Sequence, residues 1–445
     1  MYLRNRTFFF KVMGILKQGV FLCLGLIVFS NIQSWLTPRL PVVIDGYYHP
    51  AFKRVFDKFK SNLESGLEKG AGLAVYHRGV LVVDIWGGYA DLEASRPWEK
   101  DTISIGFSTT KGVAAIMVAK MVEKGLLDYK RLVMDYWPEF GQNGKDNVTV
   151  EMLLSHQAGL AALDEPISLF EFRDNPEKVE KMLASQKPIW PPGTAHGYHA
   201  ATYGSYVDVL LKKVDPKGRD TAQIFYEDFA KEYDLDMFMN TPLDQYYRVT
   251  RLYGEPQWKV LIQSFIIPRY RPLFFTMLTD PDSIVARALK SIIEFTNIKV
   301  EMHNNPSLRN IPCSCCYGTG AARGFAKIYS ILANGGQYEG KQLLTKESIY
   351  KLTETISSGH DLTIGSVTGF SRGTATKPNS LGYPVLGHTG HGGQNAYADL
   401  KNEIGMAYLT NHISVYGTGD DPRYVSLEEE VYAALKDYVK TLKKS

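Results

Sequence analysis

The chain has 445 residues, of which 44% are hydrophobic and 22% charged, a composition typical of a globular protein with a large core. Its formal net charge is +3, and lysine and arginine form no long run before the C-terminal "KTLKK", so nucleic acid is not expected as a partner. The four cysteines are too few for a disulfide scaffold.

Residues 1–40 are predicted to be a signal anchor or a signal peptide. Four basic residues precede an uncharged run over 19–36, close to the roughly 18–20 residues that cross a bilayer. No A-x-A-like cleavage site follows, which favours an anchor, although a cleaved signal stays open. Because the basic flank comes first, the N-terminus should stay cytosolic and the body should be lumenal or extracellular, or secreted after cleavage. Asn147 in "NVT" would then be a glycosylation acceptor, unless that site is buried or unused.

The body of the chain is predicted to be one domain from about residue 45 to 442, with its elements in a clear order. They are a helix over 50–69, two strands within 72–91, a short strand within 101–107, helices over 109–125, 149–156, 202–214 and 322–336, strands over 382–390, 393–400 and 403–412, and a helix over 423–442. Thr149 is the expected N-cap of its helix and Gly125 the expected C-cap residue of the Ala-rich one.

Strands at both ends and helices in the middle predict an α+β fold. Its centre should be one antiparallel sheet made by both chain ends and flanked by helices, with a mostly helical region inserted. Residues 240–310 are the least regular part, apolar and aromatic but interrupted by Pro268 and Pro272. They are predicted to be a variable, lid-like insertion or pocket wall; an interfacial membrane contact is the alternative.

The stretch "GFSTTKG" places a serine and a lysine where a predicted strand meets a predicted helix. Lys111 follows Ser108 by about one helical turn and lies on the same face. A neutral lysine could take the serine proton, and burial or a nearby positive potential would lower the pKa of its amine. The helix N-terminus adds backbone N–H groups that suit a developing oxyanion. The alternative is an ordinary strand-to-helix turn.

Two other serines carry similar motifs. "SIYK", Ser348 to Lys351, repeats S-x-x-K, but no strand precedes it and it is predicted to be helix surface. Ser371 in "GFSRG" matches the nucleophile elbow G-x-S-x-G, yet the "TATKPNSLGYP" that follows cannot form the helix that this elbow needs. Ser108 is therefore the stronger candidate.

Further motifs accompany Ser108 in a fixed order. They are "SIGFSTTKGVAAIMVAKMVEKG", "TVEMLLSHQAGL", "WPPGTAHGYHAATYG", "GTGAARGFAKIYSILANGG" and "GHTGHGG". This series resembles the serine β-lactamase and penicillin-binding-protein superfamily, in particular its class C-like branch with the family VIII esterases and the animal β-lactamase-domain proteins. The resemblance covers about residues 50–440 and is weakest over 240–310. It implies a β-lactamase/transpeptidase-like fold and an acyl-enzyme hydrolase, with no cofactor expected.

The resemblance also assigns roles to individual residues. It makes Ser108 the acyl-enzyme nucleophile and Lys111 its activating partner. Tyr198 in "GYHAATYG" corresponds to the motif tyrosine that shares the proton transfers. A phenol beside a cationic lysine is a reasonable proton carrier, so the pairing is physically sensible.

A second set of residues would form the oxyanion and substrate-binding strand. The superfamily's K-T-G motif is replaced here by His388, Thr389 and Gly390, and the amide of His391 would join that of the nucleophile as oxyanion hole. Ala200 stands where the tyrosine motif usually ends in a polar residue that helps bind amides. An imidazole is mostly neutral near pH 7, whereas a lysine holds a substrate carboxylate. Both departures argue against true β-lactamase activity.

The prediction is a serine hydrolase, most readily a carboxylesterase of uncharged small-molecule or lipid esters. A peptidase or amidase using the same residues is one alternative, and a non-catalytic β-lactamase-like scaffold or filament-forming protein is another. Cys313, Cys315 and Cys316 in "PCSCC" could pair or bind a metal, but small buried residues in a tight turn are the simpler interpretation. Two histidine pairs have H-x-x-H spacing without a zinc motif, so no metal is expected. The oligomeric state is left open.

Overall fold

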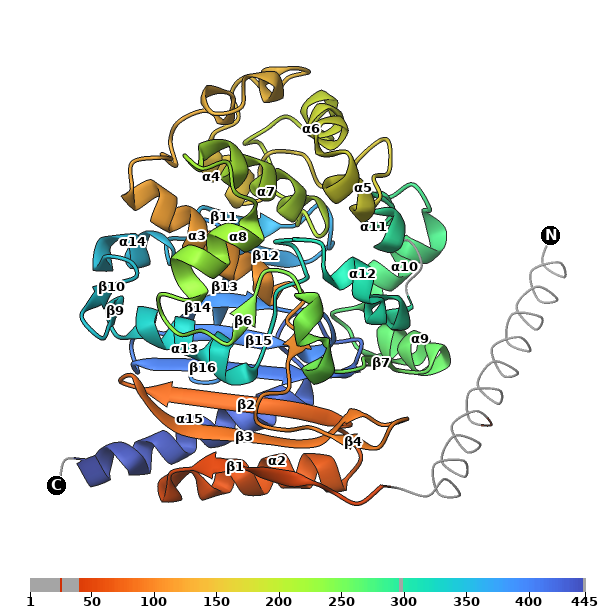
Figure 1. Cartoon of the computed structure of the whole chain (residues 1–445). Helices are drawn as coiled ribbons and strands as arrows, with labels where there is room; N and C mark the ends of the chain where they lie inside the picture. Colours follow the sequence, from red (N-terminus) through yellow and green to blue (C-terminus); the bar gives the residue numbers. More distant parts are fainter. Residues whose placement is uncertain (1–24, 26–39, 296–298, 443–445) are drawn as a thin grey trace, which may run out of the picture. The chain divides into compact units, whose positions relative to one another are not determined.

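A ten-stranded antiparallel sheet organises residues 43–445, in a computed structural model that describes residues 25, 40–295 and 299–442 (Figure 1). In spatial order its strands are β1 (Ile44–Tyr48), β3 (Val80–Asp91), β2 (Gly70–His77), β16 (Ile404–Thr410), β15 (Asn395–Asp399), β14 (Pro384–Thr389), β13 (Ala375–Pro378), β12 (Val367–Phe370) and β11 (Ser357–His360), with β4 (Arg96–Pro97) joined to β3. The predicted α+β fold with a sheet built by both chain ends is confirmed.

The two ends of the chain meet where β2 pairs with β16 in antiparallel register, with Leu73 opposite Tyr408. Every residue of both strands is buried. A strand covered on both faces has a continuous apolar sequence rather than an alternating one, which explains why these runs were recognisable. The turn between β2 and β3 falls at Arg78 and Gly79 in the sequence "HRG", and both residues have positive φ.

Helices cover the two faces of the sheet. On one face, α2 (Lys53–Glu64) and α15 (Pro422–Leu442) pack together against alternate residues of β2, β3 and β16. On the other face lie α3 (Thr109–Glu123) and α13 (Ala322–Ala333). The packing of α13 is close, because a Cβ at Gly405 of β16 would stand 2.2 Å from the backbone nitrogen of Ser330.

The first helix is shorter than the sequence predicted. It begins as the 3-10 turn η1 (Pro50–Phe52), continues as α2 and ends before Gly66, whose φ of +75° is incompatible with a continuing helix. Leu67, which was expected on the apolar helix face, therefore lies outside the helix and is 54% exposed.

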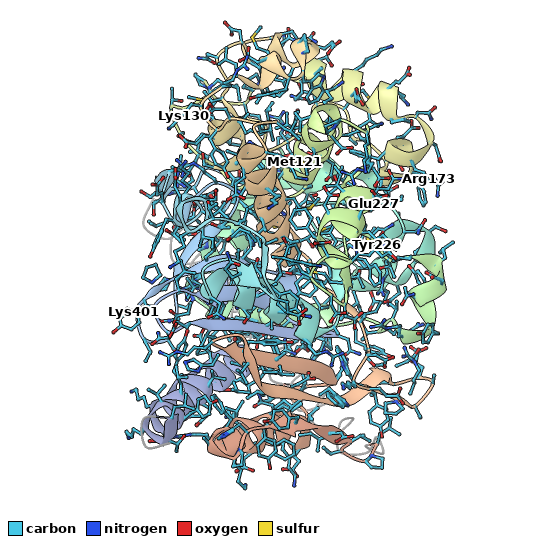
Figure 2. The ribbon with its side chains drawn as sticks, turned by 60° about the vertical axis from the view of Figure 1, so that its left-hand side comes forward. Met121, Lys130, Arg173, Tyr226, Glu227 and Lys401 are labelled. Carbon is cyan, nitrogen blue, oxygen red and sulfur yellow. The ribbon has the colours of Figure 1, made fainter. Side chains whose placement is uncertain are left out.

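The inserted region between the two halves of the sheet is mostly helical, as expected. Its helices are α3, α4 (Val150–Leu154), α5 (Leu169–Asp174), α6 (Pro176–Ser185), α7 (Thr202–Val214), α8 (Thr221–Phe225), α9 (Gln257–Ile266), α10 (Arg271–Thr279), α11 (Ile284–Lys290) and α12 (Pro306–Arg309). Thr149 caps α4 by accepting a hydrogen bond from the Met152 amide, as predicted. In Figure 2, Met121 of α3 lies inside this region, whereas Lys130 and Arg173 lie at its margin.

Residues 240–310 contain α9 to α12, so the segment is more regular than its prolines suggested. Pro268 lies between α9 and α10, and Pro272 lies in the first turn of α10, where the missing amide proton costs nothing. The segment reaches the turn that carries Ser108, because the ring of His303 packs edge-on against Phe107 with centroids 5.3 Å apart. A lid-like motion of this segment stays a prediction.

The predicted signal anchor or signal peptide over residues 1–40 falls almost wholly outside the described residues. Among the helices of the described residues, none is both long enough and apolar enough to cross a bilayer.

Candidate active site

Ser108 lies on a sharp turn between a short strand and a buried helix. The two-residue strand β5 (Ser104–Ile105) belongs to a small three-stranded sheet with β8 (Thr319–Gly320) and β6 (Met237–Phe238), and α3 starts at Thr109. Between them Phe107 has a φ of +48°, a left-handed conformation that is strained for an aromatic residue. Strain of this kind persists where the surroundings enforce it, and it is concentrated at functional sites.

Ser108 is not used as a helix cap, although it occupies the N-cap position. Its backbone is helical and its side chain makes no hydrogen bond to the first turn of α3. A serine in an ordinary strand-to-helix turn would satisfy one of those amides. Here the hydroxyl instead faces Lys111 and Tyr198, and the residue is only partly buried, so a substrate can reach it.

The three predicted catalytic side chains are in mutual contact. The Tyr198 hydroxyl lies 2.9 Å from the Ser108 Oγ and the Lys111 Nζ lies 3.2 Å from the same oxygen. Lys111 is fully buried on α3 and donates two further hydrogen bonds, to the carbonyl oxygens of Ala200 at 2.8 Å and Cys315 at 2.9 Å. These three acceptors take up all three hydrogens of an ammonium group.

The surroundings of Lys111 favour its charged form. Burial by itself lowers the pKa of its amine, but the Tyr198 phenol and the thiol of Cys315 more than compensate, so the pKa stands above its ordinary value. The sequence leaves open a neutral lysine base and a cationic lysine beside the phenol, and these contacts favour the cation. An ammonium cannot take the Ser108 proton, but it can stabilise negative charge that develops on the Tyr198 oxygen.

The end of strand β14 lies beside the turn that carries Ser108. The predicted substrate-binding motif at His388 to Gly390 requires this position. A Cβ on Gly390 would stand 2.4 Å from the carbonyl oxygen of Gly106, and the rings of His391 and Phe107 meet edge-on at 5.6 Å. Within the described residues, the amides of His391 and Ser108 donate no hydrogen bond. Two free amides on adjoining turns are the arrangement that an oxyanion hole needs.

His388 presents a neutral ring to the site. Its Nδ1 donates to the carbonyl oxygen of Thr389 at 2.6 Å, which leaves Nε2 as an acceptor that is buried and has no hydrogen-bond partner among the described residues. The ring stacks on Tyr198 with centroids 5.9 Å apart. Burial and the charge of Lys111 lower its pKa to about 3. The position therefore holds no positive charge near pH 7.

A buried carboxylate that sequence reasoning missed positions Tyr198. Asp361 is fully buried in the loop after β11, and both of its oxygens accept the Tyr198 amide at 3.1 Å. It also accepts the amides of Thr363 and Ile364 and the hydroxyl of Thr368. The sequence offers only an Asx-turn signal at this point, and nothing in it indicates a contact with a residue 163 positions away.

We expect Asp361→Ala to lower kcat about tenfold with little change in KM. The Tyr198 phenol would no longer be held in position beside Ser108, whereas the surface that contacts the substrate would stay intact. Asp361→Asn should recover part of the rate, since an amide oxygen still accepts. Asp399 is a matched control: it is equally buried and binds Asn379 and Asn402 away from the site. Asp399→Asn should cost stability without a fall in kcat; equal falls in kcat for both aspartates would contradict the positioning role.

Three buried histidines surround the site in neutral form. The Nδ1 of His156 accepts the His199 amide, and the Nε2 of His199 accepts the Leu160 amide while its Nδ1 donates to Gly197. A nitrogen that accepts a hydrogen bond carries no proton. Burial lowers the pKa of His156 well below its usual value and that of His199 to about 4, in line with the shift of His388.

These rings make the fold sensitive to acid. Near pH 7 they are mostly neutral in both states, but below the ordinary histidine pKa of 6.5 the unfolded chain binds protons that the folded chain does not, because burial holds the pKa values of these rings below that value. Each ring then costs about 1.4 kcal/mol per pH unit. Asp208 offsets the contribution of one ring to this loss of stability. Burial raises the pKa of its carboxyl to about 7, so on acidification the folded state binds this proton before the unfolded state does. We expect the free energy of unfolding to fall by about 3 kcal/mol between pH 6 and pH 5 in urea titrations. Constant or rising stability would contradict this expectation.

The rival serines do not form comparable sites. Ser348 lies on α14 (Lys346–Lys351), where Lys351 pairs with Glu347. Ser371 follows β12 and precedes the strand β13, so the helix that a nucleophile elbow requires is missing at this point of the described chain. These surroundings are consistent with the prediction that neither Ser348 nor Ser371 is the nucleophile.

Comparisons with known proteins show which family and fold this chain shares. The beta-lactamase family profile matches residues 57–426. The chain is 28% identical over 376 residues to an esterase/beta-lactamase, LipL, of Mycobacterium tuberculosis, which covers 83% of each protein. Among solved structures it superposes on a family VIII carboxylesterase with a TM-score of 0.77 and 33% identity, and on a penicillin-binding-protein homologue from Caulobacter crescentus with a TM-score of 0.73 and 31% identity. Each superposition covers 88% of this chain and 99% of the other.

Proposed function

The chain belongs to the beta-lactamase family, and from that premise we propose that it is a serine carboxylesterase acting through an acyl-enzyme on Ser108. The observation that carries the proposal is the convergence on one oxygen: the Ser108 hydroxyl is within hydrogen-bond reach of Tyr198 and Lys111 and is not spent on capping its helix. The names of relatives that are esterases support this reaction class.

The geometry supports a definite order of proton transfers. Ser108 Oγ attacks the ester carbonyl while the hydrogen-bonded pair of Tyr198 and Lys111 takes its proton. The amides of Ser108 and His391 hold the oxyanion of the tetrahedral intermediate. Tyr198 then returns the proton to the departing alcohol. Water then attacks the acyl-Ser108 ester in the place of the alcohol. Its proton passes to Tyr198 and is returned to the Ser108 oxygen as the acid leaves.

The substrate-binding strand favours uncharged esters. A lysine at position 388 would pair with a substrate carboxylate, whereas the neutral His388 offers only a hydrogen-bond acceptor at Nε2. Binding a carboxylate there would leave its charge buried and unpaired, which is costly. Ala200 supplies no side-chain group for the amide of a peptide substrate. We therefore place small-molecule or lipid esters before β-lactams, peptides and other amides.

A panel of p-nitrophenyl esters, peptide p-nitroanilides and a carboxylated chromogenic β-lactam tests this assignment. We expect hydrolysis of the esters, with kcat/KM for the anilide and the β-lactam lower by at least about 10²-fold. Hydrolysis of anilides alone would establish the peptidase or amidase alternative instead. Hydrolysis of none of the three by a folded protein would favour the non-catalytic scaffold.

We also propose that the protein enters the secretory route, with its N-terminal segment as a single-pass anchor or as a cleaved signal. The N-V-T acceptor Asn147 is exposed on the loop before α4, while Thr149 of the same motif caps the helix. A glycosidase-sensitive gel shift that disappears in Asn147→Gln would support lumenal or extracellular exposure of the body. A protein that carries no glycan when expressed in its own kind of cell would oppose it.

A further inference from the structure

Three cysteines that the proposed mechanism does not use lie together directly behind the active site. Cys313, Cys315 and Cys316 are on the loop between α12 and β8, and their exposed fractions are 5%, 2% and 7%. The Sγ atoms of Cys313 and Cys315 are 2.9 Å apart, and Cys316 Sγ lies 3.6 Å and 3.4 Å from them. All three are buried, as the interpretation of small buried residues in a tight turn expects, but this does not explain why the three sulfurs converge.

The covalent geometry decides which of these thiols can be joined. A disulfide needs Cα atoms about 4.4–6.8 Å apart, whereas adjacent residues across a trans peptide are held at about 3.8 Å. The neighbours Cys315 and Cys316 therefore make a poor pair, and Cys313 is the necessary partner of either. Its closest sulfur is that of Cys315.

Cys315 is the thiol best prepared to react. Hydrogen bonding with the thiols of Cys313 and Cys316, together with the nearby charge of Lys111, holds its pKa well below the ordinary cysteine value. The thiolate is the form that attacks peroxides and disulfides, and the best-prepared thiolates have such donors and cations beside them.

We propose that Cys313 and Cys315 are a reversible thiol-oxidation site that controls the position of Lys111. The Cys315 thiolate attacks one oxygen of hydrogen peroxide, the O–O bond breaks, and a sulfenic acid and water result. The Cys313 thiol then attacks the sulfenic sulfur and displaces a second water to form the disulfide. Two thiols thus lose two electrons and two protons, and one peroxide is reduced to two waters. A dithiol reductant reverses the step by thiol–disulfide exchange.

The connection to the active site runs through the backbone of Cys315, and its consequence rests on the proposed hydrolase function. The carbonyl oxygen of Cys315 is one of the two main-chain acceptors that hold the Lys111 ammonium. The loop has little freedom to absorb a change, because a Cβ on Gly204 of α7 would stand only 2.4 Å from the Cys315 nitrogen. Closing the disulfide shortens the sulfur separation from 2.9 Å to about 2 Å and so displaces this carbonyl.

Counting alkylated thiols tests the pair without reference to activity. The full chain carrying Cys23→Ser keeps three of its four cysteines, and we expect denaturing N-ethylmaleimide alkylation to mark three before peroxide treatment and one after it. Arsenite is added before alkylation to return any unresolved sulfenic acid to the thiol, and with it Cys313→Ala and Cys315→Ala on this background should mark two both before and after. The matched variant Cys316→Ala should fall from two to none. An unchanged count in the parent, or a fall in the Cys313→Ala variant, would overturn the pair.

Two further readouts address its consequence and its main rival. Ester hydrolysis by the parent should fall about tenfold on oxidation and return with dithiothreitol, while Cys313→Ala should be insensitive. Loss of two thiols without a change in rate would overturn the coupling to Lys111, and this outcome is distinct from a protein that shows no hydrolysis in either state. One zinc or copper ion retained per chain and lost in Cys316→Ala would assign the three thiols to a metal site instead and overturn the proposal.

Discussion

Replacing Ser108 by alanine is expected to abolish ester hydrolysis, lowering kcat by about 10⁴-fold or more. The hydroxyl oxygen is the atom on which Tyr198 and Lys111 converge, and without it no acyl-enzyme can form. The fold should be unaffected, because the side chain makes no capping hydrogen bond and is not part of the core. Initial rates with a p-nitrophenyl ester, together with thermal unfolding, measure both effects.

The chain supplies its own control in the second S-x-x-K sequence. Ser348 and Lys351 repeat the motif on α14, at the protein surface and with Lys351 paired to Glu347. Ser348→Ala should leave kcat within about twofold of the wild type, because surface substitutions away from a site change little. A Ser108→Ala enzyme that retains more than a hundredth of the rate would show that another group is the nucleophile.

Lys111→Met is the second substitution with a large expected effect, a loss in kcat of about 10³-fold. The methionine fills the volume of the lysine stem but removes the positive charge beside the phenolic oxygen of Tyr198. The proton transfer from Ser108 then creates a charge that nothing compensates. Lys111→Arg should be nearly as inactive, because the larger planar guanidinium cannot reproduce the three converging hydrogen bonds of an ammonium.

The stability effect of Lys111→Met is expected to be small in comparison. The carbonyl oxygens of Ala200 and Cys315 lose a donor, at about 1–3 kcal/mol each, but a fully buried ammonium is also removed. Lys120 is the matched control, because it stands on the same helix and donates to the carbonyl oxygens of Gln342 and Leu343, away from Ser108. Lys120→Met should lose stability and keep its kcat. If kcat of Lys120→Met fell as far as kcat of Lys111→Met, Lys111 would be shown to act only through its effect on folding.

The fold was predictable where burial leaves a mark on the sequence. The runs that became β2, β3, β15 and β16 are apolar because both of their faces are covered, and "HRG" marks the turn between the first two. The small β5–β8–β6 sheet was not predictable as a sheet, since its members are two residues long and β5 pairs with β8 across more than 200 positions. Such strands follow from tertiary packing rather than from any local preference.

The residues of the candidate site were predictable from the sequence, but their contacts and charges were less so. Ser108, Lys111 and Tyr198 follow from motifs, and the structure brings them into contact. Asp361 left only a turn signal, because its contact with Tyr198 depends on two loops meeting in space. The charge of Lys111 could not be decided from the sequence for a related reason: burial lowers a lysine pKa, but the sequence does not show the neighbouring phenol and thiols that outweigh it.

The most direct test of the central claim is to locate the nucleophile chemically. Treating the folded full chain with a fluorophosphonate probe and mapping the modified peptide by mass spectrometry measures which serine has been activated. We predict one adduct per chain, on Ser108 in the peptide that contains "GFSTTK", and no adduct in Ser108→Ala. Labelling of Ser371 or another serine, or equal labelling of the alanine variant, would contradict the assignment of Ser108.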